Sequence, residues 1–139
     1  MAWLKALFLV LGVTLIMSGM GYVIQGQSVT LMDIPLVMAS AGLCLLLNLL
    51  VFIPAAMAKT EKYFDLTGSI NYLLLMGMAL FALGDAISLR VTCLALMVCI
   101  WALRLGNYLM RRIHAQGKDG RFDEMKQRPT DFIVPWVLQ

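Results

Sequence analysis

The chain has 139 residues, of which 61% are hydrophobic and 14% are charged, and its formal net charge is +3. A soluble domain carries roughly 25% charged residues, and a chain of this length has no core large enough to bury so much apolar surface. The composition therefore excludes a soluble globular domain and predicts an integral membrane protein surrounded by the lipid bilayer, with no nucleic-acid partner.

Four apolar runs are long enough to cross about 30 Å of hydrocarbon as helices. They cover residues 6–24, 34–58, 66–83 and 87–110. Backbone groups in lipid must be hydrogen-bonded within the segment, so helices are the only sensible structure for runs of this length. An alternative for the first run is a signal peptide, but its charged region holds only Lys5 and no clear cleavage site follows.

After the fourth apolar run, a polar segment is followed by a short apolar one. Residues 111–131 are predicted to form a basic cytoplasmic loop, because Gly117 and Gly120 would interrupt any continuous helix there. A short apolar run follows at residues 132–138. This run is either an interfacial anchor with Trp136 at the headgroups or the start of another helix, and we favour the second. The expected fold is an all-α, polytopic transmembrane bundle of about four helices plus the start of a fifth, in a single membrane domain over residues 1–139.

Lysine and arginine residues are concentrated in alternate connections. Lys5 precedes the first run, Lys59 and Lys62 lie in the second connection, six cations follow residue 110, and residues 25–33 hold none. The positive-inside rule then places the N-terminus, the second connection and the tail in the cytoplasm of a multi-pass protein of the inner or cell membrane.

One polar stripe runs along the fourth apolar run. Trp101, Arg104, Tyr108 and Arg111 recur at spacings of three and four, so they share one helix face. An arginine at the centre of a membrane helix costs about 2.5–3.5 kcal/mol, which Arg104 avoids if it snorkels to the surface. Alternatively, the stripe faces the bundle interior and binds an anionic, phosphate-bearing cofactor, because guanidinium groups match phosphate oxygens.

Two further polar clusters flank the membrane. In the first cluster, one interpretation is that Asp65 or Thr67 caps the third helix. The other is that Asp65 lines a substrate pocket together with Ser69 and Asn71. The second covers residues 117–124, where charges of both signs are interleaved; a solvated loop with weak ion pairs is its alternative. The three cysteines fit no zinc or redox spacing, and no metal site is predicted.

Short motifs on the later part of the chain follow one another in a fixed order. They are Phe64-Asp65-Leu66-Thr67-Gly68-Ser69, Trp101-Ala102-Leu103-Arg104-Leu105-Gly106, Arg111-Arg112 and Gly117-Lys118-Asp119-Gly120-Arg121-Phe122-Asp123-Glu124-Met125-Lys126. In this order they resemble the uncharacterised bacterial branch of the steroid 5-alpha reductase-like membrane proteins. The resemblance covers about residues 59–139, and the first two helices by hydropathy alone.

The resemblance implies an NADPH-dependent reductase that transfers hydride to a carbon–carbon double bond conjugated with a carbonyl, in a steroid-like or other lipid substrate. It implies Asp65 as a catalytic residue and Ser69 and Asn71 as substrate-binding residues. The residues that it places at the cofactor are Arg104, Tyr108, Arg111, Arg112 and Arg121.

The chain also departs from this family. Relatives are longer, and their second half holds a nucleotide-binding motif of the type Arg-His-Pro-Asn-Tyr-Phe-Gly-Glu, which has no match here; Gly120 stands where the family often has a second arginine. We therefore expect an N-terminal portion that is complemented by a C-terminal half and has no catalysis on its own. Two alternatives stay open: a lipid methyltransferase of the isoprenylcysteine type, and a non-enzymatic small four-helix membrane protein.

Overall fold

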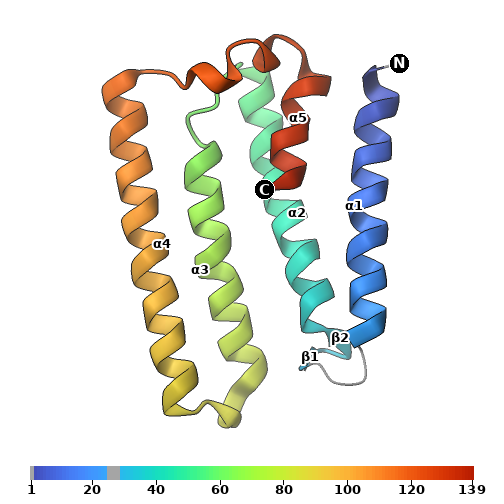
Figure 1. Cartoon of the computed structure of the whole chain (residues 1–139), viewed down its shortest axis with the longest axis vertical. Helices are drawn as coiled ribbons and strands as arrows, with labels where there is room; N and C mark the ends of the chain where they lie inside the picture. The colour runs from blue at the N-terminus through green and yellow to red at the C-terminus, as the bar shows by residue number, and fades with distance from the viewer. Residues whose placement is uncertain (1, 25–28) are drawn as a thin grey trace.

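The computed structural model describes residues 2–24 and 29–139, which are helical almost throughout. Four long helices run alternately up and down (Figure 1), and a shorter one ends the chain. They are α1 (Ala2–Ile24), α2 (Leu36–Met57), α3 (Phe64–Leu83), α4 (Leu89–Gln116) and α5 (Pro129–Leu138). The predicted all-α fold is confirmed, and the remaining elements are short.

The connections hold two-residue strands and single helical turns. Strands β1 (Thr30–Leu31) and β2 (Ile34–Pro35) pair in an antiparallel hairpin before α2. Three 3₁₀ turns follow later, η1 (Gly84–Ala86) between α3 and α4, and η2 (Gly120–Phe122) and η3 (Met125–Gln127) between α4 and α5. The hairpin closes through Met32 and Asp33, both with positive φ, as tight hairpin turns require.

Each of the four long helices contains a stretch long and apolar enough to cross a membrane. These stretches are Leu7–Ile24, Leu36–Met57, Phe64–Ala86 and Leu89–Gln116. Their outer faces carry exposed leucine, isoleucine, valine and phenylalanine side chains along most of their length, which lipid solvates and water does not. The chain is therefore a multi-pass membrane protein embedded in a lipid bilayer.

The four long helices stand in a row, with α4 at one edge and α1 at the other (Figure 1). Helix α5 packs against α1 and α2 near one end of the helix axes, the end where α1 begins. We call this end the loop end, because residues 58–63 and 117–128 both lie there (Figure 1). The start of α1 lies at the same end, as alternating spans require; its cytoplasmic orientation stays a prediction.

Helix α4 is longer than the sequence indicated. It continues to Gln116, so Arg111 and Arg112 lie on a helix and not in the expected loop over residues 111–131. The apolar pattern ends near Met110 because the helix leaves the hydrocarbon there, but nothing in residues 111–116 breaks a helix. It ends where Gly117 adopts a left-handed conformation with φ of 76°, a common helix terminator.

The apolar run at residues 132–138 lies in helix α5, as we favoured, and Trp136 is buried in the bundle, unlike the headgroup tryptophan of the interfacial-anchor alternative. Phe132 and Trp136 are both 0% exposed. Trp136 contacts Phe52 and Phe64 edge-on, with ring centroids 6.2 Å and 5.1 Å away. An aromatic core therefore joins α5 to α2 and α3 and fixes the geometry of the loop end.

Candidate functional site at the loop end

The first turn of α3 leaves the carboxylate of Asp65 available for tertiary contacts. The helix begins at Phe64, and its N-cap residue Tyr63 makes no side-chain capping bond. The Thr67 hydroxyl donates to the Tyr63 carbonyl oxygen at 2.7 Å. Neither Asp65 nor Thr67 is therefore the N-cap that the sequence offered as an alternative, because the helix starts before both of them.

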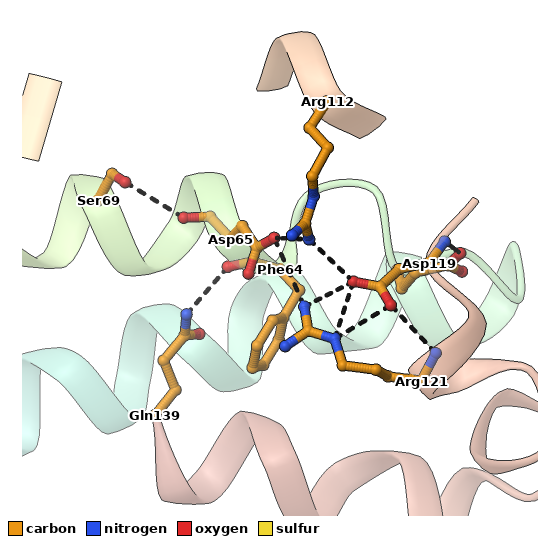
Figure 2. Close-up of polar contacts among 8 residues, drawn as sticks. Phe64, Asp65, Ser69, Arg112, Asp119, Arg121 and Gln139 are labelled. Carbon is orange, nitrogen blue, oxygen red and sulfur yellow. Dashed lines mark hydrogen bonds and ion pairs between the residues drawn. The ribbon is translucent and has the colours of Figure 1, made fainter. Parts of the chain in front are cut away.

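Two carboxylates and two guanidinium groups meet beside this turn (Figure 2). We call Asp65, Arg112, Asp119 and Arg121 the ion cluster. Arg112 Nη2 lies 3.5 Å from Asp65 Oδ2 and 3.1 Å from Asp119 Oδ2. Arg121 Nη2 lies 3.9 Å from Asp65 Oδ2 and also donates to Asp119. Residues from α3, α4 and the following loop thus form one site, although 47 positions separate Asp65 from Arg112.

The cluster is electrically balanced, with two positive and two negative groups. The hydrogen bond from Arg121 holds the pKa of Asp119 below its usual value, against the opposing effect of burial. The same bond raises the pKa of Arg121, so both groups are charged near neutral pH. Arg112 Nε is buried and has no hydrogen-bond partner among the described residues, so one strong donor in the cluster is unused.

Glu61 contacts the backbone of the ion cluster at Asp119 and was missed by the sequence analysis. It is only 5% exposed. Its Oε1 accepts the backbone N–H of Asp119 at 2.8 Å, and its Oε2 lies 3.2 Å from Lys126 Nζ. Burial raises the pKa of Glu61, but these hydrogen bonds outweigh it and the net pKa is lowered. A glutamate between Lys59 and Lys62 gives no sequence signal of burial, because such residues are usually exposed.

Ser69 lies at a close approach between α3 and α4. A Cβ atom added to Gly106 of α4 would lie 2.9 Å from Cβ and Oγ of Ser69, so only glycine permits this approach. The Ser69 hydroxyl donates to the backbone carbonyl oxygen of Asp65 at 3.3 Å (Figure 2). Ser69 thus belongs to the same region as Asp65, as the sequence predicted, but its hydroxyl bonds to its own helix.

Most of the polar stripe of α4 points away from the other described helices, although Trp101 at its start packs edge-on against Tyr72 of α3, with ring centroids 5.0 Å apart. Arg104, Tyr108 and Arg111 are exposed, whereas Ala102 and Gly106 are buried on the opposite side. Two residues along a helix correspond to a rotation of about 200°, which places Arg104 opposite the face that packs on α3. The expected inward orientation of Arg104 is therefore not found in the described residues, because the small side chains of α4 occupy the contact face. The predicted cofactor role of these residues stays a prediction.

Asn71 lies deeper in the bundle than the ion cluster. Its Nδ2 donates to Asn48 Oδ1 of α2 at 2.8 Å, and both side chains are buried. A cavity of about 210 Å³ separates this pair from the ion cluster and is lined by Asp65, Ser69, Asn71 and Gln139 among others. Gln139 closes part of it by donating from Nε2 to the Phe64 carbonyl oxygen at 3.0 Å (Figure 2).

Fold and site together define a helical, multi-pass membrane protein with a charged cluster and a small adjoining cavity towards one end of its bundle. Residues 51–139 match the family described as protein of unknown function, DUF1295. The match covers more than half of the chain, which therefore belongs to this family. No curated protein and no solved structure matches the chain.

Proposed function

We propose that this chain is part of an NADPH-dependent membrane reductase, similar to the steroid 5-alpha reductases, that acts on a double bond of a lipid substrate. One observation carries the proposal. Asp65, Ser69, Arg112 and Arg121, which the resemblance assigned to one site, lie together at the loop end although they come from three separate segments. The nearby cavity gives the substrate end of such a site a defined place.

The donor set fits the phosphate groups of NADPH, which would supply the hydride when bound. Two guanidinium groups converge on one carboxylate oxygen of Asp119, as they would on a phosphate oxygen. Arg112 Nε adds a donor without a partner among the described residues, and the Arg121 side chain is 61% exposed. In this proposal Asp119 holds the arginines in place until a phosphate replaces it.

Asp65 contacts both halves of the proposed site. Its carboxylate approaches Arg112 and Arg121, and the residue also lines the cavity with Ser69 and Asn71. This position favours Asp65 for the catalytic role and the two polar residues for substrate binding. Arg104, Tyr108 and Arg111 enter the proposal through the resemblance alone.

The direct test is nucleotide binding to the purified chain. We expect NADPH to bind in a fluorescence titration of its nicotinamide and S-adenosylmethionine not to bind in a thermal-shift assay. Arg112→Gln and Arg121→Gln should each weaken NADPH binding about tenfold, which corresponds to about 1.4 kcal/mol. Arg90→Gln, an exposed position at the far end of α4, is the matched control and should leave binding unchanged.

Asp119→Asn separates a phosphate site from a purely structural cluster. Removing the competing negative charge should tighten NADPH binding if a phosphate takes its place, and weaken it if Asp119 only orders the loop. Binding of S-adenosylmethionine in place of NADPH would transfer the assignment to the methyltransferase alternative. Binding of neither nucleotide would overturn the enzyme proposal for this chain and favour the non-enzymatic alternative.

A further inference from the structure

Two asparagine side chains are paired inside the membrane-spanning part of the bundle. Asn48 of α2 is 2% exposed and Asn71 of α3 is 5% exposed. Asn71 lies seven residues beyond the start of α3, and Asn48 lies nine residues before the end of α2. At 1.5 Å per residue, the pair therefore lies about 10–14 Å from the loop end. A primary amide is costly to place at this depth unless it is fully hydrogen-bonded.

The pair is not fully hydrogen-bonded. Asn71 Nδ2 donates to Asn48 Oδ1 at 2.8 Å, while Asn71 Oδ1 is buried and accepts no hydrogen bond from the described residues. Each amide has one carbonyl oxygen and one NH₂ group. Whichever of the two amides donates, their single mutual bond leaves one carbonyl oxygen and one NH₂ group outside it. The site therefore needs a group that both donates and accepts.

Two cavities meet beside this pair. The larger, of about 590 Å³, lies between α1, α2 and α5 and is lined by Asn48. The smaller, of about 210 Å³, is lined by Asn71. Both are lined by Cys44, Leu75 and Gln139, so they adjoin at these residues. The larger cavity has the size of a small-molecule site, roughly 300–1,000 Å³.

The larger cavity offers a ligand a mainly apolar surface. Most of its lining residues are aliphatic, methionine or alanine. The Thr14 hydroxyl donates to the Val10 carbonyl oxygen at 2.7 Å, and the Ser40 hydroxyl donates to the Leu36 carbonyl oxygen at 2.6 Å. These donors are used within their own helices, as is common for hydroxyls in apolar helices. Ser18 and Gln139 also line this cavity but are exposed residues, so the Asn48–Asn71 pair is the buried polar feature beside it.

We propose that the Asn48–Asn71 pair and the adjoining apolar cavity bind a single-chain amphiphile that carries a hydroxyl group. The alkyl chain lies between α1, α2 and α5. The hydroxyl donates its proton to the unpartnered carbonyl oxygen and accepts from the NH₂ group outside the mutual bond. This inference shares Asn71 and the smaller cavity with the substrate end of the reductase proposal, but it rests on the amide pair and the larger cavity, and its test uses no nucleotide.

The chemistry selects this ligand over the other amphiphiles of a bilayer. The ester carbonyls of a phospholipid only accept hydrogen bonds, so they leave Asn71 Oδ1 without a partner. An ionised fatty acid also only accepts, and its charge is far more costly at this depth than a hydroxyl. A hydroxyl satisfies both groups without a charge, and an alkyl chain fills the apolar lining.

Hexadecan-1-ol is a suitable probe, and 1-methoxyhexadecane is its control because a methyl group replaces the donor proton while the acceptor oxygen and the alkyl chain are kept. The full chain is placed in phosphatidylcholine nanodiscs, and binding of radiolabelled hexadecan-1-ol is measured without nucleotide. We expect saturable binding that unlabelled hexadecan-1-ol displaces at least tenfold better than the ether does. Equal displacement by the two compounds, or no saturable binding beyond empty nanodiscs, would overturn the proposal.

Two variants test the site from the protein side. Asn71→Leu removes the acceptor and should weaken hexadecan-1-ol binding about tenfold. Leu75→Trp fills the wall shared by the cavities and should abolish binding with both amides intact. Asn107→Leu, at an exposed position of α4 that lines neither cavity, should bind like the unaltered chain. Unchanged binding by Asn71→Leu, or equal loss in Asn107→Leu, would contradict the assignment, and the comparison of alcohol and ether remains decisive if a variant does not fold.

Discussion

The carboxylate of Glu61 accepts the backbone N–H of Asp119 at 2.8 Å, across 58 positions of the sequence. This bond fastens the loop after α4 to the connection between α2 and α3. Because Asp119 also binds Arg112 and Arg121 through its side chain, Glu61 positions the acceptor around which the ion cluster forms. A buried residue outside the predicted site thus holds the site together.

Replacing Glu61 with alanine should destabilise the loop end. The change leaves the N–H of Asp119 without its acceptor and removes the carboxylate beside Lys126, which is only 15% exposed. Hydrogen bonds to charged groups contribute about 1.5–3 kcal/mol, so we expect a loss of about 2–3 kcal/mol in the free energy of unfolding. Thermal denaturation in detergent measures it.

Glu124→Gln is the control for that experiment. Glu124 is an exposed carboxylate of the same loop, and removing its charge should change stability by less than about 0.5 kcal/mol, as is usual for surface positions. Equal effects of the two substitutions would show that the loop charge matters and the Glu61 bond does not.

Lowering the pH should destabilise the loop end. The pKa values of Glu61 and Asp119 are both lower in the folded protein than their usual values. The unfolded chain then binds more protons than the folded chain in acid, so stability rises with pH. The stabilisation is complete above the unfolded pKa values, near pH 4–4.5, and is lost as pH falls through the lower folded values.

A pH series of melting temperatures checks this sign. The melting temperature should be nearly constant from pH 7 to about pH 5 and fall below about pH 4.5. Glu61→Gln should reduce the steepness of that fall, because one of the three loop-end carboxylates with a lowered pKa, Glu61, Asp119 and Asp123, no longer titrates. A fall that is equally steep in the variant would assign the acid sensitivity to other groups.

The membrane spans were predictable because their signal is local. A run of about 20 apolar residues has one low-energy form in lipid, and the ends of α1, α2 and α3 lie close to the ends of their apolar runs. The end of α4 was missed because hydropathy marks where the hydrocarbon ends, whereas the helix ends at the conformation of Gly117. Local patterns thus predict which segments are helical more accurately than they predict where each helix ends.

The site was predictable only in part, because its contacts join distant segments. The structure brings Asp65 next to Arg112 and Arg121, three of the residues that the resemblance assigned to the site, whose roles stay predictions. The helical stripe left two orientations open for Arg104, inward or snorkelling to the surface, because periodicity shows only which residues share a face, not which face packs. The contact face of α4 was decided by Ala102 and Gly106, whose small size lets α3 approach.

Arg111 and Arg112 are neighbours with different environments, and their alanine variants should differ accordingly. Arg112 bridges Asp65 and Asp119, while Arg111 is exposed on the other side of α4. Arg112→Ala should lower the free energy of unfolding by about 1–2 kcal/mol, since its ion pairs are partly buried. Arg111→Ala should change it by less than about 0.5 kcal/mol. Thermal melts in detergent distinguish the two, and equal losses would remove Arg112 from the cluster.

The two glycines Gly106 and Gly77 give the sharpest test of the contact between α3 and α4. A Cβ atom at Gly106 would lie 2.9 Å from Ser69, whereas at Gly77 it would meet nothing within 4 Å. Gly106→Ala should therefore push the helices apart and cost about 1–3 kcal/mol. Gly77→Ala should be neutral or stabilising by about 0.5–1 kcal/mol, because alanine favours a helix interior.

Thermal melts of the two glycine variants measure these stability changes, and a cysteine cross-link reports the helix spacing. Moving α4 away from Ser69 also separates Arg112 from Asp65, so Gly106→Ala should slow cross-linking between cysteines placed at these two positions, while Gly77→Ala should not. A Gly106→Ala variant as stable as Gly77→Ala would mean that α3 and α4 do not pack closely at Ser69, and the ion cluster would then lose the helix contact that aligns it.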